Sequence, residues 1–313
     1  MQTSLLEKYQ ATELGQQAEK ILRKCVHCGF CLATCPTYDL LGNELDSPRG
    51  RIYQIKQVLE GEVPTNSTQL HLDRCLTCRN CETTCPSGVE YGHLVDAGRG
   101  IVEESVPRPA TQRLLRWSMR KVLPYKNRIG PLLSVGQLFR AVLPATLKSH
   151  IPPKQQAGSW PATTHTRKML ILDGCVQPSM APSINSATAR VLDKLGIQLI
   201  AAPQAGCCGA VSYHLNAQTE GLDFVKRNID AWWPEIDAGA EAIVMTASGC
   251  GVFVKDYAHL LKDDPDYAAK AQKVTELCKD ISEILIDEEQ SNEHFSQLTA
   301  STSQGRLAFH PPC

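Results

Sequence analysis

The sequence predicts an α+β protein of several parts, with a helical N-terminal module and a C-terminal α/β domain whose sheet is mainly parallel. Three observations lead to this fold class. A cysteine motif repeats after 50 residues among segments of helical pattern, short strands alternate with helices from Arg167 onward, and a proline-rich basic stretch separates the two regions. The chain of 313 residues is long enough for two domains, and 42% hydrophobic with 21% charged residues is an ordinary globular composition.

The repeated motif has the form Cys-x2-Cys-x2-Cys-x3-Cys-Pro, and its two copies run from Cys25 to Pro36 and from Cys75 to Pro86. Three thiolates at intervals of three residues let a tight loop surround one face of a cubane 4Fe-4S cluster. The fourth, followed by proline, is turned away, and in two-cluster ferredoxins it binds the other cluster. The predicted ligands are therefore Cys25, Cys28, Cys31 and Cys85 for one 4Fe-4S cluster, and Cys75, Cys78, Cys81 and Cys35 for the other.

Zinc and disulfides are the alternative uses of so many cysteines. Structural zinc sites usually take two cysteine pairs separated by a longer loop, and a four-coordinate ion has no use for eight thiolates in this arrangement. Disulfides are typical of exported proteins, whereas Met1 to Lys20 contains no apolar stretch of signal-peptide type. With 14 cysteines, the chain is expected to be cytoplasmic, in a reducing compartment where clustered thiols bind metal.

Residues 1–105 form the predicted ferredoxin-type domain. Its helices are expected at Leu5–Lys24, Arg51–Glu60 and His93–Glu104, which places one helix before, one between and one after the two motifs. Four arginines near the motifs either place positive charge beside the clusters or are solvated, and the sequence does not decide between these readings: Arg49, Arg51, Arg74 and Arg79. His27, inside the first motif, reads as a loop residue more readily than as a ligand.

Residues 106–166 form a predicted linker in which prolines separate short amphipathic pieces. From Ser105 to Leu172 there is no Asp or Glu, whereas Lys and Arg occur 12 times. Apolar side chains such as Leu114, Trp117, Leu138 and Phe139 alternate with these cations. Such segments bind anionic membrane surfaces, and no run reaches the roughly 18 apolar residues of a spanning helix. We therefore expect the linker to dock peripherally on the cytoplasmic membrane or on a partner subunit.

Residues 167–313 form the predicted α/β domain. Strands are expected at Met169–Leu172, Gln198–Ala202 and Ala242–Thr246, because these short apolar runs end at glycine and cysteine. Helices are expected at Ser183–Leu195, at Val211–Ala231 and within Asp266–Glu289. The last of these would place Cys278 in mid-helix as a core residue. The alternation of strand and helix favours a parallel sheet covered by helices.

Four cysteines follow the carboxyl ends of three successive strands: Cys175, Cys207, Cys208 and Cys250. Open α/β sheets place their ligands at this edge, and Gly206 and Gly209 give the backbone freedom to turn both adjacent thiols toward one point. The four residues are candidates for a further metal or iron-sulfur site. The alternative is that they are small buried hydrophobic residues, as free cysteines commonly are.

Two other classes of function are disfavoured. No Gly-x-Gly-x-x-Gly follows a predicted strand, so we expect no flavin on this chain and no dehydrogenase activity of its own. A net charge of −1 is not that of a nucleic-acid-binding protein.

The combined motifs resemble the iron-sulfur subunits of bacterial glycolate oxidase. The resemblance extends along the whole chain and includes Asp46-Ser47-Pro48-Arg49-Gly50-Arg51 between the cysteine motifs, Cys85-Pro86-Ser87-Gly88-Val89 after them, and the Cys-Cys-Gly stretch Ala205-Gly206-Cys207-Cys208-Gly209-Ala210. It implies a complex in which separate FAD-binding glycolate oxidase subunits oxidise glycolate to glyoxylate. This chain would then carry electrons toward a membrane quinone.

Alternatives remain within and outside this resemblance. Iron-sulfur subunits of lactate and glycerol-3-phosphate dehydrogenases are similar, and a non-redox scaffold whose clusters only hold the fold is the alternative from another class. Members of the family carry two Cys-Cys-Gly repeats, whereas Arg306 to Cys313 only begins to echo the first, with Pro311 where relatives have cysteine. The chain is therefore expected to be truncated before the second repeat. The first repeat also lacks the closing Cys-x-x-Cys of heterodisulfide reductase, since Phe253 stands at that distance from Cys250.

Overall fold

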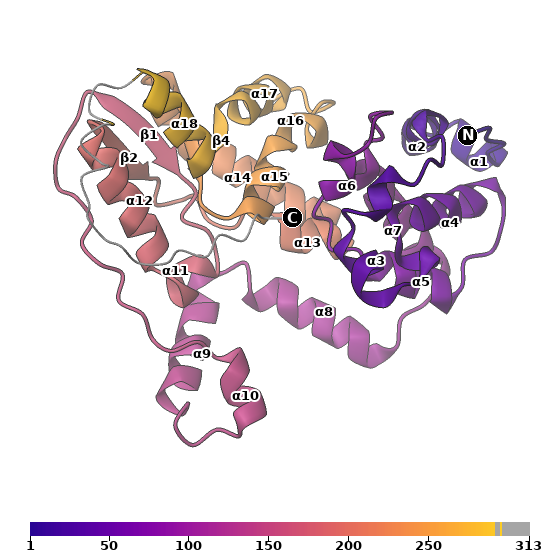
Figure 1. The fold of residues 1–313 in the computed structure, drawn as a ribbon, viewed down its shortest axis with the longest axis horizontal. Coiled ribbons are helices and arrows are strands. Elements are labelled where there is room, and N and C mark those ends of the chain that lie inside the picture. Colours follow the sequence, from indigo (N-terminus) through magenta and orange to yellow (C-terminus); the bar gives the residue numbers. More distant parts are fainter. Residues whose placement is uncertain (292–294, 296–313) are drawn as a thin grey trace. The chain divides into compact units, whose positions relative to one another are not determined.

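The computed structural model describes residues 1–291 and residue 295, and these residues divide into two compact units (Figure 1). The first unit is Met1–Arg113 and the second begins at Leu114. The boundary lies inside a helix, α8 (Ala110–Val122). Each unit has its own core and is described separately.

The first unit is helical throughout its described residues. Its elements are α1 (Glu7–Gln10), α2 (Glu13–Lys24), η1 (Phe30–Leu32), α3 (Pro36–Leu41), η2 (Glu44–Asp46), α4 (Pro48–Glu60), α5 (Asn66–Asp73), α6 (Asn80–Thr83) and α7 (Tyr91–Ser105), where η marks a 3-10 helix. The core lies where α2, α4 and α7 meet, and Leu22, Leu59 and Leu94 are fully buried in it.

Two of the three helices predicted for this unit are confirmed, and the third is broken. The helices α4 and α7 begin two or three residues earlier than expected, α4 because Ser47 caps it by accepting a hydrogen bond from Gly50 N (2.9 Å) and Pro48 fits its first turn. The helix predicted at Leu5–Lys24 was wrong in its continuity. Thr12 caps α2, its hydroxyl accepting from Gly15 N (3.1 Å), and the chain turns there between α1 and α2.

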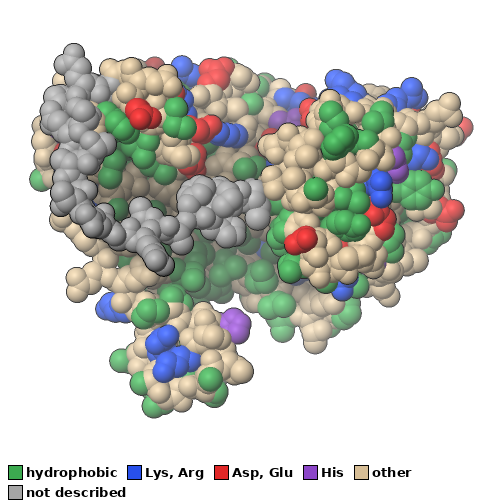
Figure 2. Space-filling model, viewed as in Figure 1, with side chains coloured by type: hydrophobic (Ala, Val, Ile, Leu, Met, Phe, Trp, Pro, Cys, Tyr) green, Lys and Arg blue, Asp and Glu red, His purple; other side chains and the backbone are tan. Residues whose placement is uncertain are grey.

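The second unit opens with three helices, α8, α9 (Lys126–Leu138) and α10 (Ala145–His150). No described residue of α8 or α9 is fully buried. Figure 2 shows Lys, Arg and hydrophobic side chains, and no Asp or Glu, on the visible face of the lobe formed by α9 and α10. Among the described helices of the whole chain, none is long and apolar enough to cross a membrane.

A four-stranded parallel sheet follows, which confirms the predicted α/β architecture. Its strands are β1 (Arg167–Ile171), β2 (Ile197–Ala201), β3 (Ile243–Met245) and β4 (Cys278–Asp280), in the spatial order β2-β1-β3-β4. Its helices are α11 (Gln177–Met180), α12 (Ser183–Lys194), α13 (Ala210–His214), α14 (Gln218–Asp237), α15 (Ser248–Lys255), α16 (Tyr257–Leu260), α17 (Ala268–Leu277) and α18 (Ile281–Ser291).

The sheet is buried on both faces, as expected for parallel strands. Leu170 and Leu172 pack with α14, α15 and α17, whereas Met169 and Ile171 pack on the opposite face with α12 and α18. The alternation along β1 fixes the register, because a slip by one residue would exchange the two sets.

Two helices predicted for this unit were wrong. The helix expected at Val211–Ala231 is two helices, α13 and α14, because Asn216 between them adopts a left-handed conformation (φ 61°). The long helix expected within Asp266–Glu289 is interrupted by β4. Cys278 therefore lies in an edge strand paired with Ile243, where it is buried as predicted but not in a helix. The stretch from Arg306 to Cys313 lies outside the described residues.

Candidate metal centres

The two cysteine motifs adopt the same backbone conformation at equivalent positions. His27 and Thr77, which follow the first cysteine of each motif by two residues, have φ of 56° and 55°. Gly29 and Arg79, two residues later, are also left-handed, with φ of 85° and 58°. Non-glycine residues rarely adopt this conformation and do so mostly at constrained functional loops. The 50-residue repeat of the sequence is therefore also a repeat of loop geometry.

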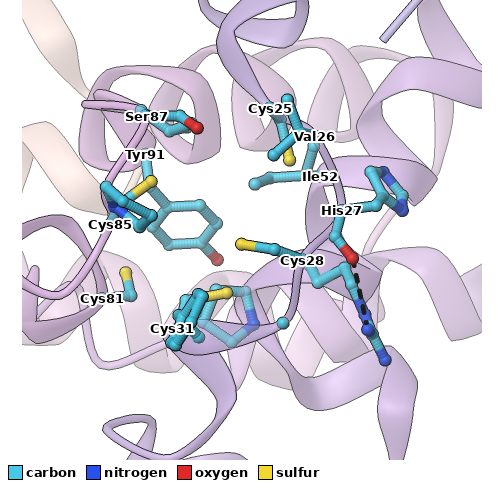
Figure 3. A pocket seen from close by; sticks show the side chains of 16 residues that line it. Cys25, Val26, His27, Cys28, Cys31, Ile52, Cys81, Cys85, Ser87 and Tyr91 are labelled. Atoms are coloured by element: carbon cyan, nitrogen blue, oxygen red, sulfur yellow. Dashed lines mark hydrogen bonds between the residues drawn. The ribbon is translucent and has the colours of Figure 1, made fainter.

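Cysteines of the first motif line a pocket together with the last cysteine of the second motif (Figure 3). Four of its lining cysteines are those predicted for one cluster, Cys25, Cys28, Cys31 and Cys85, and the fifth is Cys81. The space between them measures about 430 Å³, part of it open to solvent. Ile52 and Val89 are among the apolar side chains of its wall.

A second pocket of about 290 Å³ is lined by the other predicted set: Cys35, Cys75, Cys78 and Cys81. Pro48, Cys81 and Tyr91 line both pockets, which places the two sites side by side. Each pocket thus brings together three cysteines of one motif and the last cysteine of the other.

Three thiols of these sites, Cys25, Cys31 and Cys81, are held in surroundings that disfavour their charged form. Burial, with a smaller effect of Cys25 nearby, raises the pKa of the Cys31 thiol to about 11. Burial also raises the pKa of Cys25, and raises that of Cys81 well above its ordinary value. At neutral pH such thiols are mostly protonated, and a bound cation that supplies the compensating charge favours the thiolate. The donor set therefore fits a positively charged metal-containing group.

Two buried side chains that sequence reasoning did not single out support the second motif. Arg99, on α7, donates through Nη2 to the carbonyl oxygens of Cys75 (2.6 Å) and Leu72 (3.0 Å) and through Nη1 to Thr77 Oγ1 (2.9 Å). Tyr91 donates its hydroxyl to Cys75 Sγ at 3.5 Å. A sequence pattern that could have identified them is a large polar residue among the core-facing positions of the helix that follows the second motif.

A buried ionic network adjoins the second pocket. Arg51 Nε donates to the carbonyl oxygen of His71 (2.7 Å), and Nη1 donates to Thr37 Oγ1 (3.1 Å), which itself lies 3.2 Å from Cys35 Sγ. Asp46 lies 3.4 Å from Arg51 Nη2, 2.9 Å from Arg74 Nη1 and 2.9 Å from His71 Nδ1. Burial would raise the pKa of Asp46, but the hydrogen bond from His71 and the attraction of Arg74 outweigh it, and its pKa is lowered.

The structure also brings together the four cysteines predicted for a further site in the second unit. Cys175 follows β1, Cys207 and Cys208 lie between β2 and α13, and Cys250 lies in the first turn of α15 after β3. Hydrogen bonds link neighbouring thiols in the order Cys175, Cys207, Cys208, Cys250. Bonds donated by Cys175 and Cys208 lower the pKa of Cys207 to about 3.

Buried polar groups hold the backbone of this second cysteine group. Asn228 donates to the carbonyl oxygen of Cys207 (2.8 Å) and accepts from Gly206 N (3.0 Å), and the Tyr257 hydroxyl donates to the carbonyl oxygen of Cys208 (2.6 Å). All these groups are satisfied within the protein, so the Cys-Cys-Gly turn is a rigid part of the core.

Within residues 1–291 and 295, no group of three or more Cys, His, Asp or Glu side chains lies close enough together to hold a metal ion. In the first unit, the thiols instead line two open pockets of about 430 and 290 Å³, volumes that include space open to solvent. A cluster of several metal and sulfide atoms is the kind of group that such spacing suits. The role of the four cysteines in the second unit stays a prediction.

Comparison with known protein families agrees with the two cysteine-rich regions. Residues 21–89 match the model of a 4Fe-4S dicluster domain, and residues 169–255 match that of a Cysteine-rich domain. No solved structure matches the chain.

Two curated relatives match along most or all of the chain, and a third matches a shorter part of it. The Glycolate oxidase iron-sulfur subunit of Escherichia coli (strain K12) is 54% identical over 314 residues, which cover 100% of this chain and 76% of that protein. The Probable glycolate oxidase iron-sulfur subunit of Bacillus subtilis (strain 168) is 31% identical over 85% of this chain and 66% of its own length. Lactate utilization protein A of Bacillus cytotoxicus is 27% identical over 38% of this chain and 48% of its own length.

Proposed function

Because the chain belongs to the family of glycolate oxidase iron-sulfur subunits, we propose that it is the electron-transfer subunit of a complex that oxidises glycolate to glyoxylate. It holds two 4Fe-4S clusters, receives electrons from a separate FAD-binding subunit and passes them toward a membrane quinone. The chain itself binds no flavin and has no dehydrogenase activity of its own.

The observation that carries this proposal is the exchange of the last cysteines between two adjoining pockets. Two-cluster ferredoxins use the same exchange, in which the fourth cysteine of each motif serves the other cluster. Cys25, Cys28, Cys31 and Cys85 would hold one cluster, and Cys75, Cys78, Cys81 and Cys35 the other. When bound, such clusters supply one-electron transfer.

The remaining residues of the pockets have a supporting role in this proposal. Apolar side chains such as Ile52 and Val89 form part of the wall of the first site and limit its contact with water. Arg99 fixes the backbone at Cys75, while Tyr91 and Thr37 place hydroxyl groups beside the sulfur atoms of Cys75 and Cys35. Fixed hydrogen bonds and restricted access of solvent are the means by which proteins adjust cluster potentials.

The proposal extends to the membrane through α9 and the residues after it. Apolar side chains recur every three or four residues along this segment, and all of them are more than half exposed: Leu132, Val135, Leu138, Phe139 and Val142. They lie in the acid-free stretch with 12 Lys and Arg residues. Exposed apolar side chains among cations match an anionic phospholipid surface, where a quinone would be reached. The bound subunit would thus be peripheral.

Metal analysis tests the proposed cofactors. Purified anaerobically, the full chain is expected to contain about eight iron atoms and about eight sulfide ions. A higher iron content would mean that Cys175, Cys207, Cys208 and Cys250 bind a further cluster. One zinc per chain without sulfide would contradict the proposal.

A further inference from the structure

The two candidate cluster pockets differ in the charge of their walls. Arg51 and Arg79 both line the pocket of Cys35, Cys75, Cys78 and Cys81, and Arg51 is the buried one of the two, at 1% exposed. Its guanidinium group is fixed by hydrogen bonds to the carbonyl oxygen of His71 and to Thr37 Oγ1, both of them uncharged partners. A cation held in this way cannot turn toward solvent.

The charge of Arg51 is only partly compensated. Asp46, its acidic partner, is 0% exposed and is shared with Arg74, whose Nη1 lies closer to the carboxylate (2.9 Å) than does Nη2 of Arg51 (3.4 Å). One carboxylate between two guanidinium groups leaves a formal net positive charge in this network. Solvent screens Arg74, whose side chain is 39% exposed, whereas Arg51 is buried and is not screened in this way. His71, at 2.9 Å from the same carboxylate, adds to that charge if protonated and does not reduce it if neutral.

The other pocket has no buried Lys or Arg among the described residues of its wall, and the N-terminal ammonium group of Met1, which is not a lining residue, donates to the carbonyl oxygen of Cys25 at 2.8 Å. Among its lining residues, all of them in the described part of the chain, Arg49 is the only Lys or Arg. It forms an ion pair with Glu44 at 2.8 Å, and both side chains are about a third or more exposed to solvent. Solvent and the paired carboxylate both screen this cation.

We propose that Arg51 and its network raise the reduction potential of the cluster held by Cys35, Cys75, Cys78 and Cys81. Electrons therefore pass from the other cluster to this one. This inference rests on the proposed function and adds a direction to it. Electrons enter at the cluster of Cys25, Cys28, Cys31 and Cys85, which has the lower potential. They then reduce the second cluster, which has the higher potential.

The physical reason is that reduction adds a negative charge to a cluster. A fixed cation on the wall of a partly buried site favours the reduced state, and the low local dielectric constant strengthens this effect compared with water. Arg51 acts on the cluster through space and through Thr37 beside Cys35, and is therefore a positioning and tuning residue that binds no iron itself.

Anaerobic redox titration of the full chain, followed by EPR, tests the proposal. Cys78→Ser identifies the signal of the second pocket, since it alters a ligand of that site only. In the unaltered chain this signal is expected to have the higher potential. Arg51→Gln is expected to decrease its reduced-to-oxidised ratio at a fixed potential roughly tenfold, which equals 59 mV for one electron, and to leave the other signal within about twofold.

Two further variants separate charge from loss of structure. Arg51→Lys keeps the cation and is expected to retain most of the potential. Asp46→Asn removes the negative charge and is expected to shift the same signal in the opposite direction from Arg51→Gln, an effect that simple damage to the fold would not produce. Arg49→Gln serves as the matched control at the first pocket, with little effect on the second signal.

The outcomes distinguish this inference from the proposed function. A chain without iron and sulfide would contradict the function itself. Eight iron atoms with the higher potential at the first pocket would overturn only the role of Arg51, as would unchanged potentials in a fully loaded Arg51→Gln protein. If Arg51→Gln loses its iron, Asp46→Asn decides: a raised potential supports the proposal, and an unchanged or lowered one contradicts it.

Discussion

Single residues explain how two short loops present six thiols to two adjoining pockets of one helical unit. The left-handed backbone at His27 and Thr77 turns the chain sharply between the first and second cysteine of each motif. Arg79 adopts, without being glycine, the conformation that Gly29 adopts in the first motif. The cost of such conformations, about 1–3 kcal/mol each, is offset only where the surrounding structure or a bound group fixes the loop.

The exchange of ligands between motifs gives a prediction at this scale. Cys85 lines the pocket of the first motif and Cys35 that of the second. Cys85→Ser is therefore expected to alter or remove the EPR signal of the cluster bound by Cys25, Cys28 and Cys31, because serine is a poorer ligand for iron. Cys35→Ser is the reciprocal variant and should affect the other signal. Loss of the opposite signal in either variant would contradict the pairing.

At the scale of elements, local signals predicted most helices and the first three strands, but not β4. The fold class and the convergence of cysteines at three strand ends follow from periodicity and from the glycines and cysteines that end each strand. The segment around Cys278 is different, because α17, β4 and α18 follow one another almost without turn residues. Pairing with Ile243 in the buried sheet decides its conformation, and such a tertiary preference leaves no local pattern.

The buried polar side chains beside the cluster pockets could not be predicted from the sequence, because their positions also depend on tertiary packing. The position of Arg51 near the motifs identified it as a residue that could place positive charge beside a cluster. The sequence was equally consistent with an Arg51 side chain that is solvated. Arg99 and Tyr91 act through helix packing that brings α7 against the second motif. The motif spacing identifies the thiols, whereas the residues around them depend on the tertiary structure.

Packing of α7 against α4 gives a prediction for these elements. A Cβ atom at Gly98 would lie 2.6 Å from Cγ1 of Ile55, which is 1% exposed and has no room to move. Gly98→Ala is expected to destabilise the first unit by about 1–3 kcal/mol, since overpacking outweighs the gain in helix propensity. Thermal unfolding of the full chain, monitored by circular dichroism, measures this change.

The matched control lies two residues away on the same helix. Gly100 has nothing within 4 Å of the position that a Cβ atom would take. Gly100→Ala should therefore leave stability unchanged or increase it by up to about 1 kcal/mol. Equal effects of the two substitutions would show that the contact between α4 and α7 is not tight.

At the scale of the whole molecule, the exposed apolar side chains after α8 provide the proposed membrane contact. Arg120 and Lys121 each form an ion pair with Glu220, so the apolar residues of α9 are the sharper test. The double variant Leu138→Ser, Phe139→Ser is expected to weaken binding to vesicles containing anionic phospholipid at least tenfold, since each buried side chain of this size contributes about 1.5–3 kcal/mol. Added salt should weaken binding further.

The control for vesicle binding uses apolar side chains of the first unit that are more exposed than Leu138 and Phe139. Leu40 and Val63 are each 82% exposed and lie outside the basic stretch, so Leu40→Ser with Val63→Ser should bind as the unaltered chain does. Equal binding by all three proteins would refute the membrane contact. Loss of copurification with the flavin subunit, without loss of vesicle binding, would instead assign this surface to a protein interface.

The central claim is that this chain carries electrons released from glycolate, and anaerobic reduction of its clusters in the complex with the flavin subunit tests it most directly. Addition of glycolate is expected to bleach the visible absorption of the clusters and produce their reduced EPR signals, and a quinone analogue should then reverse both changes. Clusters that stay oxidised with glycolate but are reduced by lactate or glycerol 3-phosphate would contradict the proposed donor. Clusters that no donor reduces would contradict electron transfer itself.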